Sequence, residues 1–258
     1  MSDPQCKALL TAVNLTKRFG GLAANQGVNL SLERGKLHAL LGPNGAGKST
    51  CINMLSGDLP LSEGRILYEG HDISRLTAHQ RSRIGIGRSY QRTNIFPQFT
   101  VFENCRLAAQ SRQQRAWKIF SSAAVDFAPE KERAMAAIEE TGLRDRCSRQ
   151  AGTLSHGEQR QLEIAMVLAT QAQVLLLDEP LAGMGSEESA KMVELLRRLR
   201  ASHAILLVEH DMDAVFSVAD TITVMVNGVV LESGSPLQIR ASADVQRAYL
   251  GHEGSFHV

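Results

Sequence analysis

The stretch Gly42-Pro-Asn-Gly-Ala-Gly-Lys48-Ser49-Thr50 decides the fold of this 258-residue chain. It satisfies the pattern G-x-x-x-x-G-K-[ST], and it stands between an apolar run that favours a strand and residues that favour a helix. Glycines at this spacing let backbone N–H groups converge on phosphate oxygens, at a helix N-terminus that also favours negative charge. Lys48 is expected to reach the β- and γ-phosphates of ATP, and the Ser49 hydroxyl to ligate Mg²⁺. All nine residues are predicted to contact the nucleotide: Gly42, Pro43, Asn44, Gly45, Ala46, Gly47, Lys48, Ser49 and Thr50.

The residues around this loop predict an α/β fold. Apolar and polar residues alternate over residues 8–41, which predicts strands joined by turns at Gly20-Gly21 and Arg34-Gly35. Residues 174–177 and 204–208 are almost wholly apolar, which is typical of parallel strands buried on both faces, and a helix is predicted between them at 187–200. Helices are also predicted at 102–110 and 129–141. The sequence therefore predicts a parallel-sheet core, an N-terminal antiparallel portion and a helical insertion.

Charged side chains follow both apolar runs. Asp178 and Glu179 come directly after residues 174–177, and ligands of open parallel sheets bind at the carboxyl ends of the strands. Asp178 suits a second ligand position on Mg²⁺, and Glu179 is placed to polarise an attacking water. His210 follows the run 204–208 and is predicted to contact the γ-phosphate at the same edge. The alternatives are a solvent-facing acidic pair and a structural histidine, and the neighbouring phosphate loop argues against both.

The composition excludes several other classes of protein. Lys and Arg total 28 against 27 Asp and Glu, so the chain lacks the excess of positive charge that is typical of a dedicated nucleic-acid binder. The longest apolar runs fall far short of the roughly 20 residues that span a bilayer, so any membrane role is expected to be peripheral. Residues 1–7 carry no apolar segment typical of a secretory signal. The four cysteines form no C-x-x-C pair, which favours a reducing compartment.

The segment Leu154-Ser-His-Gly-Glu-Gln-Arg160 resembles the signature motif of the ATP-binding-cassette (ABC) ATPases. The other motifs stand in that family's order, and the resemblance extends over residues 10–250. It implies a single ABC ATPase domain over residues 1–258, with a P-loop NTPase (RecA-like) core. In this division the core consists of residues 1–91 and 158–258, and the helical insertion subdomain of about 92–157.

The resemblance also implies roles for individual residues. Phe19 matches the aromatic that stacks on adenine, and Gln91 matches the glutamine that joins Mg²⁺ to the helical subdomain. Glu179 matches the general base, and His210 the switch histidine. The catalytic set is then Lys48, Gln91, Glu179 and His210, and the metal ligands are Ser49, Gln91 and Asp178.

Ser155, Gly157 and Glu158 belong to the signature motif, which in this family binds the ATP held by a partner subunit. The resemblance therefore implies that each complete site needs a second ABC ATPase subunit, either identical or related. Two departures from the family pattern stand out. His156 replaces the usual signature glycine, and Gly185 replaces the Asp or Asn expected in the loop that communicates across the dimer.

Within the family the chain is most similar to ATPase subunits of importers for branched-chain amino acids and for urea and short amides. The segments behind this finer assignment are Lys17-Arg-Phe-Gly-Gly21, Thr100-Val-Phe-Glu-Asn104, Pro180-Leu-Ala-Gly-Met184 and Ala248-Tyr-Leu-Gly251. The implied partners are membrane-spanning permease subunits and, indirectly, a periplasmic or extracellular substrate-binding protein, without nucleic acid. The implied location is peripheral, on the cytoplasmic face of the inner membrane.

Two alternatives remain open at this stage. The chain resembles a cassette of an exporter or lipid-extraction system in its ATP site, and less closely a non-transport ABC ATPase. It lacks the long heptad insertion, the zinc-binding Cys pairs and the second cassette of the non-transport relatives.

Two further segments suggest contacts outside the ATP site. Ile95, Phe96 and Phe99 are expected either to line a groove for a cytoplasmic helix of a membrane subunit or to pack the insertion's own core. A basic stretch is expected to be a solvated helix face, with lipid headgroups or a partner as the alternative; it comprises Arg112, Arg115, Trp117 and Lys118.

Overall fold

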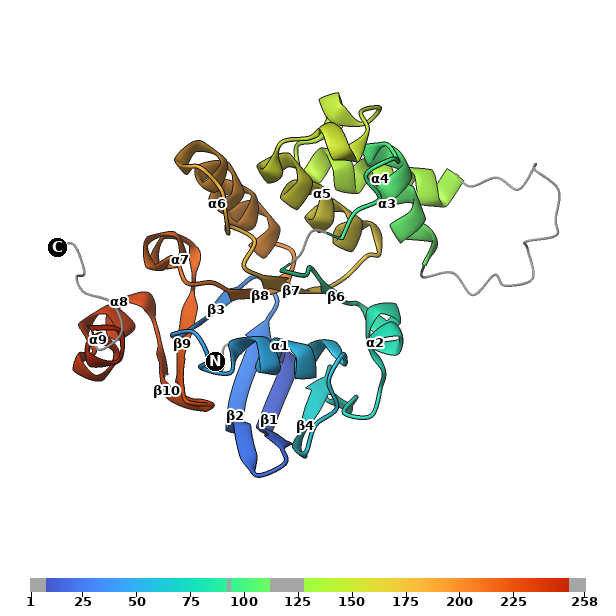
Figure 1. Cartoon of the computed structure of the whole chain (residues 1–258). Coiled ribbons are helices and arrows are strands. Elements are labelled where there is room, and N and C mark those ends of the chain that lie inside the picture. The colour runs from blue at the N-terminus through green and yellow to red at the C-terminus, as the bar shows by residue number, and fades with distance from the viewer. Residues whose placement is uncertain (1–7, 92–93, 112–127, 251–258) are drawn as a thin grey trace, which may run out of the picture.

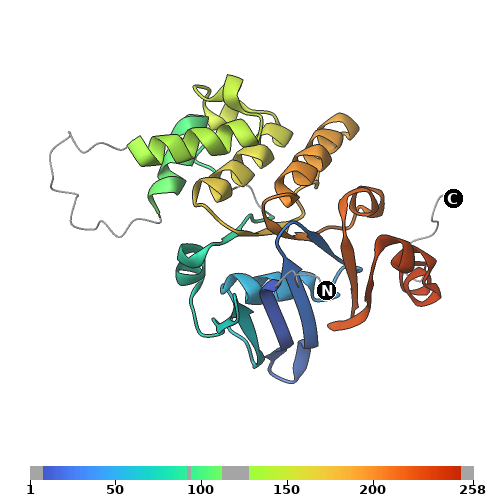
Figure 2. The same ribbon diagram turned by 180° about the vertical axis from the view of Figure 1, so that it is seen from behind.

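A computed structural model of the chain describes residues 8–91, 94–111 and 128–250. Figure 1 shows two sheets with α1 (Lys48–Ser56) between them, and a group of helices on the far side of the larger sheet. Figure 2 shows the same layers from behind. The α/β class, the antiparallel N-terminal portion and the helical insertion predicted from the sequence are confirmed. The basic stretch at residues 112–118 lies outside the described residues.

The smaller sheet is antiparallel and comes from the N-terminal third of the chain. Its order is β2 (Leu22–Glu33), β1 (Ala8–Phe19), β4 (Glu63–Tyr68) and β5 (His71–Asp72). The predicted turns at Gly20-Gly21 and Arg34-Gly35 separate β1 from β2 and β2 from the next strand.

The larger sheet carries the predicted parallel core. Its order is β10 (Val229–Gly234), β9 (Thr221–Val226), β3 (Leu37–Leu41), β8 (Ala204–Val208), β7 (Val174–Asp178) and β6 (Ile86–Arg88). All neighbours are parallel except β10 and β9. Val208 pairs with Leu40 on one side and with Asp178 on the other, so β3, β8 and β7 end level with one another. This register brings the segments that follow the three strands to one edge.

Burial on both faces explains why these strands are nearly all apolar. Leu175 and Leu177 belong to the core shared with the helices of the far layer. Val174 and Leu176, which alternate with them, belong to the core shared with α1 and the antiparallel sheet. Successive side chains of a strand point to opposite faces, so a strand between two layers needs apolar residues at every position.

The helices include the predicted ones and several that the sequence did not predict. The far layer contains α3 (Val101–Gln110), α4 (Ala128–Glu140), α5 (His156–Ala169) and α6 (Ser186–Arg200), with short 3₁₀ turns at Arg144–Arg146 and Ala151–Thr153. Not predicted were α2 (Ala78–Ile84), α7 (Met212–Val218), α8 (Pro236–Ala241) and α9 (Ala243–Leu250). All four are helices of only six to eight residues, too short to show a clear period in the sequence.

The lengths and positions of the helices concern two of the predictions, the peripheral membrane role and the boundaries of the insertion. Among the described residues, no helix is both long enough and apolar enough to cross a bilayer. The proposed division into a core and an insertion of about 92–157 places its second boundary in the first turn of α5, which begins at His156.

Candidate functional site

Residues 42–50 comprise the loop between β3 and α1 together with the start of α1, and they form one wall of a cavity of about 600 Å³. Residues 44–50 line this cavity together with Gln91, Glu179 and residues of the segments 22–24 and 227–228. Its volume lies in the range of nucleotide and cofactor pockets. The structure therefore brings most of the predicted phosphate loop, the predicted general base and the predicted Gln91 to one cavity.

Gly47 and Lys48 show why the loop needs its residue types. Gly47 has φ +96°, and a Cβ there would lie 2.5 Å from the carbonyl oxygen of Ala24. Lys48 is only 6% exposed, and its Nζ donates to the carbonyls of Gly42 at 2.5 Å and Pro43 at 3.1 Å. Burial lowers the pKa of Lys48, while three carboxylates at the sheet edge oppose that shift. The ammonium group is thus held inside the curve of the loop.

Glu179 stands where β7 ends, in a left-handed backbone conformation with φ +49°. Such a conformation is rare outside glycine and is typically maintained at functional sites. Its N–H donates to Val208 at 2.8 Å, and its Oε2 accepts a hydrogen bond from Gln91 Nε2 at 3.0 Å. The two residues predicted to act on water and metal therefore contact each other directly.

His210 follows β8 at the same edge and has an exposed side chain. The residue before it, Glu209, is fully buried. Glu209 accepts hydrogen bonds from the N–H of Leu181 at 2.8 Å and of His210 at 3.2 Å. Burial raises the pKa of this carboxyl group. Glu209 thus ties the loop after Glu179 to the loop that carries His210.

Asp178 is buried and forms an ion pair with a residue that the sequence did not single out. Its Oδ2 accepts a hydrogen bond from Arg88 Nη2 at 3.2 Å, and Arg88 Nη1 donates to Asp58 Oδ2 at 2.8 Å. The Arg88 guanidinium also lies 4.7 Å from the ring centre of Tyr90. Burial raises the pKa of Asp178, and Arg88 acts in the opposite direction. Arg88 therefore holds Asp178 in place through this ion pair.

Phe19 ends β1 and is half exposed, with Lys17 Nζ 5.2 Å from its ring centre. It is not among the residues that line the phosphate-loop cavity. The same holds for Gly42, Pro43, Asp178 and His210, which the sequence also assigned to the site.

The signature residues lie away from the phosphate-loop cavity. Ser155 is the N-cap of α5, and its hydroxyl accepts from the N–H of Glu158, whose carboxylate in turn accepts from the Ser155 N–H. Ser155, Gly157 and Glu158 line a separate cavity of about 110 Å³, together with residues of α6. The structure therefore does not bring the signature motif together with the phosphate loop of its own chain.

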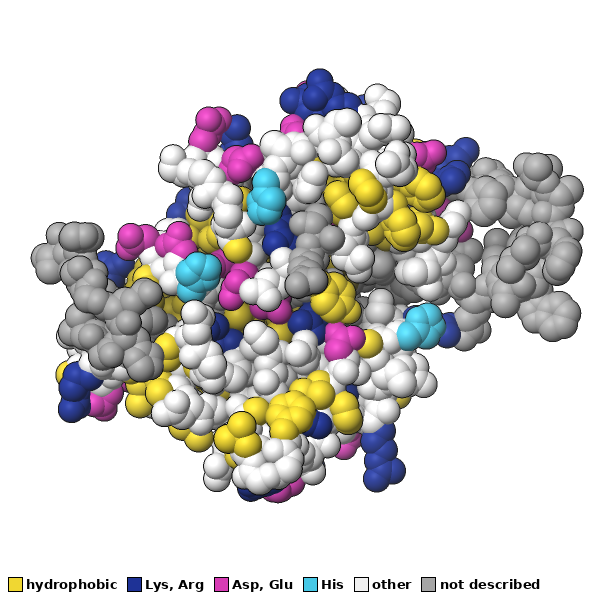
Figure 3. Space-filling view, viewed as in Figure 1, with side chains coloured by type: hydrophobic (Ala, Val, Ile, Leu, Met, Phe, Trp, Pro, Cys, Tyr) yellow, Lys and Arg dark blue, Asp and Glu magenta, His cyan; other side chains and the backbone are white. Residues whose placement is uncertain are grey.

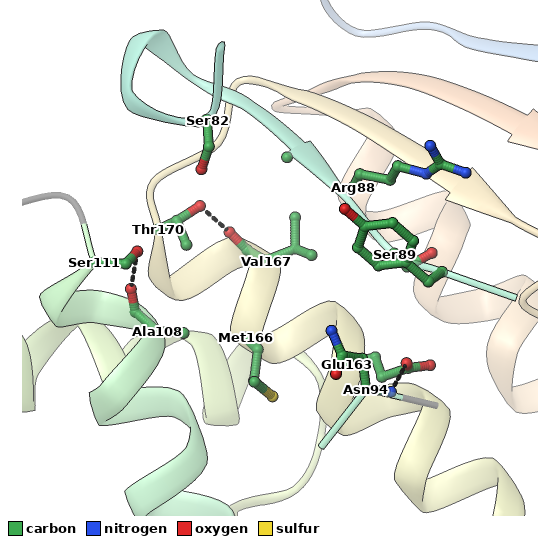
Figure 4. A pocket seen from close by; sticks show the side chains of 12 residues that line it. Ser82, Arg88, Ser89, Asn94, Ala108, Ser111, Glu163, Met166, Val167 and Thr170 are labelled. Carbon is green, nitrogen blue, oxygen red and sulfur yellow. Dashed lines mark hydrogen bonds between the residues drawn. The ribbon is translucent and has the colours of Figure 1, made fainter. Parts of the chain in front are cut away.

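A buried ion pair connects the segment around Gln91 to α5. Arg160 donates to the carbonyls of Tyr90, at 2.9 Å, and Gln91, and it pairs with Glu163 at 2.7 Å. Glu163 also accepts from the N–H of Asn94 at 2.6 Å, a bond drawn in Figure 4. The pair thereby holds the chain before and after residues 92–93 against the helix that presents the signature residues. It borders a cavity of about 180 Å³ between α5 and β6.

Sequence reasoning missed Arg88, Glu209, Arg160 and Glu163. A usable signal existed for Glu209, because a charged residue at the end of a wholly apolar parallel strand points to the functional edge of the sheet. Arg160 and Glu163 show the i, i+3 spacing of a helical ion pair, but that spacing does not indicate that both side chains are buried.

Comparisons with known proteins show similarity over most of the chain. The family model described as "ABC transporter" matches residues 25–182. The branched-chain amino acid transport ATP-binding protein BraF of Pseudomonas aeruginosa is 39% identical over 252 residues, covering 95% of this chain and 98% of that protein. The corresponding protein LivG of Escherichia coli is 40% identical over 264 residues, covering 97% and 99%.

More distant relatives also align over almost the whole chain. The lipopolysaccharide export system ATP-binding protein LptB of Escherichia coli is 32% identical over 247 residues, covering 95% of this chain and 98% of that one. Among solved structures, an ATP-binding cassette of an ABC transporter in its ADP conformation superimposes with a TM-score of 0.83 at 28% identity. That match covers 95% of this chain and all of the solved one.

Proposed function

The chain belongs to the ABC transporter family and is an ATPase of that family, and from this premise we propose that it powers import through separate membrane subunits. We propose branched-chain amino acids as the cargo class, with urea and short amides as the nearest alternative. The observation that carries this proposal is 39–40% identity, over almost the whole chain, to two proteins named for branched-chain amino acid transport. The relative named for lipopolysaccharide export is 32% identical, which supports the exporter alternative less well.

We further propose that the 600 Å³ cavity binds Mg·ATP. The proposed metal ligands are the Ser49 hydroxyl, the Gln91 amide and the Asp178 carboxylate, and oxygen ligands of this kind suit Mg²⁺. Among the described residues no group of three or more His, Cys, Asp or Glu side chains is arranged to hold a metal ion. Mg²⁺ usually keeps several waters and takes its remaining ligands from substrate phosphates. When bound, the ion would neutralise charge on the β- and γ-phosphates.

The proposed mechanism assigns one task to each side of the cavity. The N–H groups of residues 44–50 and the Lys48 ammonium hold the phosphates. Glu179, fixed at the edge by its backbone bond to Val208, orients and polarises the attacking water, and Gln91 bonds to the same carboxylate. His210 is proposed to contact the γ-phosphate and Phe19 to contact the adenine. Because Ser155 and Gly157 lie at a different cavity, we propose that they bind the ATP of a partner subunit.

An uptake assay tests the proposed cargo class. Cells that lack this chain are expected to lose most ATP-dependent uptake of labelled leucine, and the wild-type chain is expected to restore it while the Glu179→Gln variant does not. Urea uptake in the same cells distinguishes the nearest alternative. Unchanged uptake of both compounds, together with loss of lipid export, would establish the exporter alternative instead.

We also propose that Phe96 and Phe99 contact a cytoplasmic helix of a permease subunit. Their rings stack with centres 5.4 Å apart, and the side chains are 48% and 43% exposed. Ile95, by contrast, is partly buried against the core. The buried side chain of Asn104 holds Phe96 through its N–H, at 2.8 Å, and its carbonyl, at 3.1 Å. Figure 3 shows hydrophobic side chains gathered on this helical part of the surface, over α3 and α4.

The Phe96→Glu variant is expected to lower transport by the assembled complex at least about tenfold, because an introduced charge would be desolvated at an apolar contact. Its ATPase activity without membrane subunits is expected to stay within about twofold of wild type, since the ring faces outward. Leu237→Glu is the matched control, because Leu237 is 81% exposed on α8, far along the chain. A large drop in melting temperature for Phe96→Glu would show that Phe96 packs the core of the insertion.

A further inference from the structure

The first turn of α6 supplies a carboxylate to the signature residues of the same chain. Glu188 Oε1 accepts hydrogen bonds from the Ser155 hydroxyl at 2.9 Å and from the Gly157 N–H at 3.3 Å. One oxygen therefore takes a hydroxyl and a backbone N–H at the N-terminus of α5. This is the arrangement in which helix N-termini bind anions.

The close fit depends on the residue at position 157. A Cβ on Gly157 would lie 2.9 Å from both Cδ and Oε1 of Glu188, so a larger residue would push the carboxylate away. Glu188 and Gly157 line the 110 Å³ cavity with Ser155, Glu158 and Lys191. The other charges of this cavity have their own ion pairs, Lys191 with Glu187 at 2.7 Å and Glu158 with Arg146 at 2.8 Å. Glu188 instead accepts its hydrogen bonds from the two signature donors, the Ser155 hydroxyl and the Gly157 N–H.

These donors are the ones that the proposed function assigns to the γ-phosphate held by a partner subunit. Two anions cannot share them, because a carboxylate and a phosphate oxygen at the same hydroxyl and N–H would repel each other strongly. We propose that Glu188 occupies the partner-facing phosphate site of the free subunit, and that its withdrawal is required when two ATP-loaded subunits associate. Glu188 is thus a positioning residue that sets the affinity of the ATP-bound dimer, an inference that rests on the proposed two-subunit site.

The position of Glu188 in the fold gives this contact a second consequence. α6 begins at Ser186, seven residues after Glu179, and it lies beside α5 in both ribbon views. The bonds of Glu188 therefore join the N-terminus of α5 to the segment that leaves the proposed general base. When a γ-phosphate displaces Glu188, this link between α5 and α6 is released at the same moment that the site is completed.

Dimer affinity in the presence of Mg·ATP tests the inference. The full-length chain carrying Glu179→Gln, which slows hydrolysis, is the background, and association is measured by sedimentation velocity over a range of protein concentrations. Adding Glu188→Ala is expected to lower the dissociation constant about tenfold per site, hence about a hundredfold for a dimer with two sites. Adding Glu188→Gln is expected to act in the same direction but less strongly, because its amide oxygen still accepts hydrogen bonds but carries no charge.

Glu187→Gln is the matched control. It removes the same charge from the same helix turn but faces Lys191, so the dissociation constant is expected to change by less than about twofold. If Glu188 merely supported the end of α5, its loss would weaken the dimer, and that sign of the effect would overturn the inference. An unchanged constant would also overturn it. If no variant binds ATP, the proposed function itself fails; if all variants bind ATP and remain monomeric, only the two-subunit site and this inference fail.

Discussion

Replacing Glu179 with glutamine is expected to slow ATP turnover by about 10²–10⁴-fold while ATP binding stays intact. The amide keeps the size of the side chain and can still contact Gln91, which donates to Glu179 at 3.0 Å. It has no negative charge with which to attract a proton from the attacking water. The substitution therefore slows the chemical step and leaves the affinity for nucleotide unchanged.

Phosphate release at saturating ATP measures this effect, and equilibrium binding of a fluorescent ATP analogue measures affinity. Glu194→Gln is a suitable control, because Glu194 lies on an exposed part of α6 and only approaches Arg197, at 3.7 Å. Turnover of the Glu179 variant within a few-fold of wild type would exclude Glu179 as the base. The control is expected to keep wild-type turnover.

Replacing Lys48 with alanine is expected to weaken ATP binding by about 10²-fold or more. Lys48 is the buried cation of the phosphate loop, and Asp178, Glu179 and Glu209 act on it electrostatically. Without the ammonium group these carboxylates would face the triphosphate uncompensated. The loop would also lose the bonds that Lys48 donates to Gly42 and Pro43.

Thermal unfolding with and without ATP separates loss of binding from loss of folding. A ligand that binds only the native state stabilises it by RT ln(1 + [L]/Kd), so ATP at a concentration above the wild-type Kd and below that of the variant should raise the melting temperature of wild type and not that of Lys48→Ala. Lys36→Ala, which removes a lysine paired with Glu33 at 2.6 Å, is expected to keep the full ATP-dependent shift. An equal shift in the Lys48 variant would contradict its proposed role.

The sequence by itself determined the elements that depend on near neighbours. The phosphate loop and the apolar runs of β7 and β8 were both predicted from residues a few positions apart. The cap of α5 is local in the same way, because Ser155 bonds to Glu158 only three residues later. Capping, turn formation and strand alternation are local effects, so a short segment carries the information for them.

The tertiary structure decided which distant residues meet. Arg88 pairs with Asp178 across 90 positions, and Glu163 bonds the N–H of Asn94 across 69. It also decided that Ile95 turns inward while Phe96 turns outward, although the two are adjacent and both apolar. These outcomes depend on the strand order of the large sheet and on how the far helices pack against it. No local pattern encodes the strand order or the packing of these helices. In the sequence, Glu188 is simply an acidic residue in the first turn of a helix. Only the packing of α6 against α5 brings its carboxylate to Ser155 and Gly157.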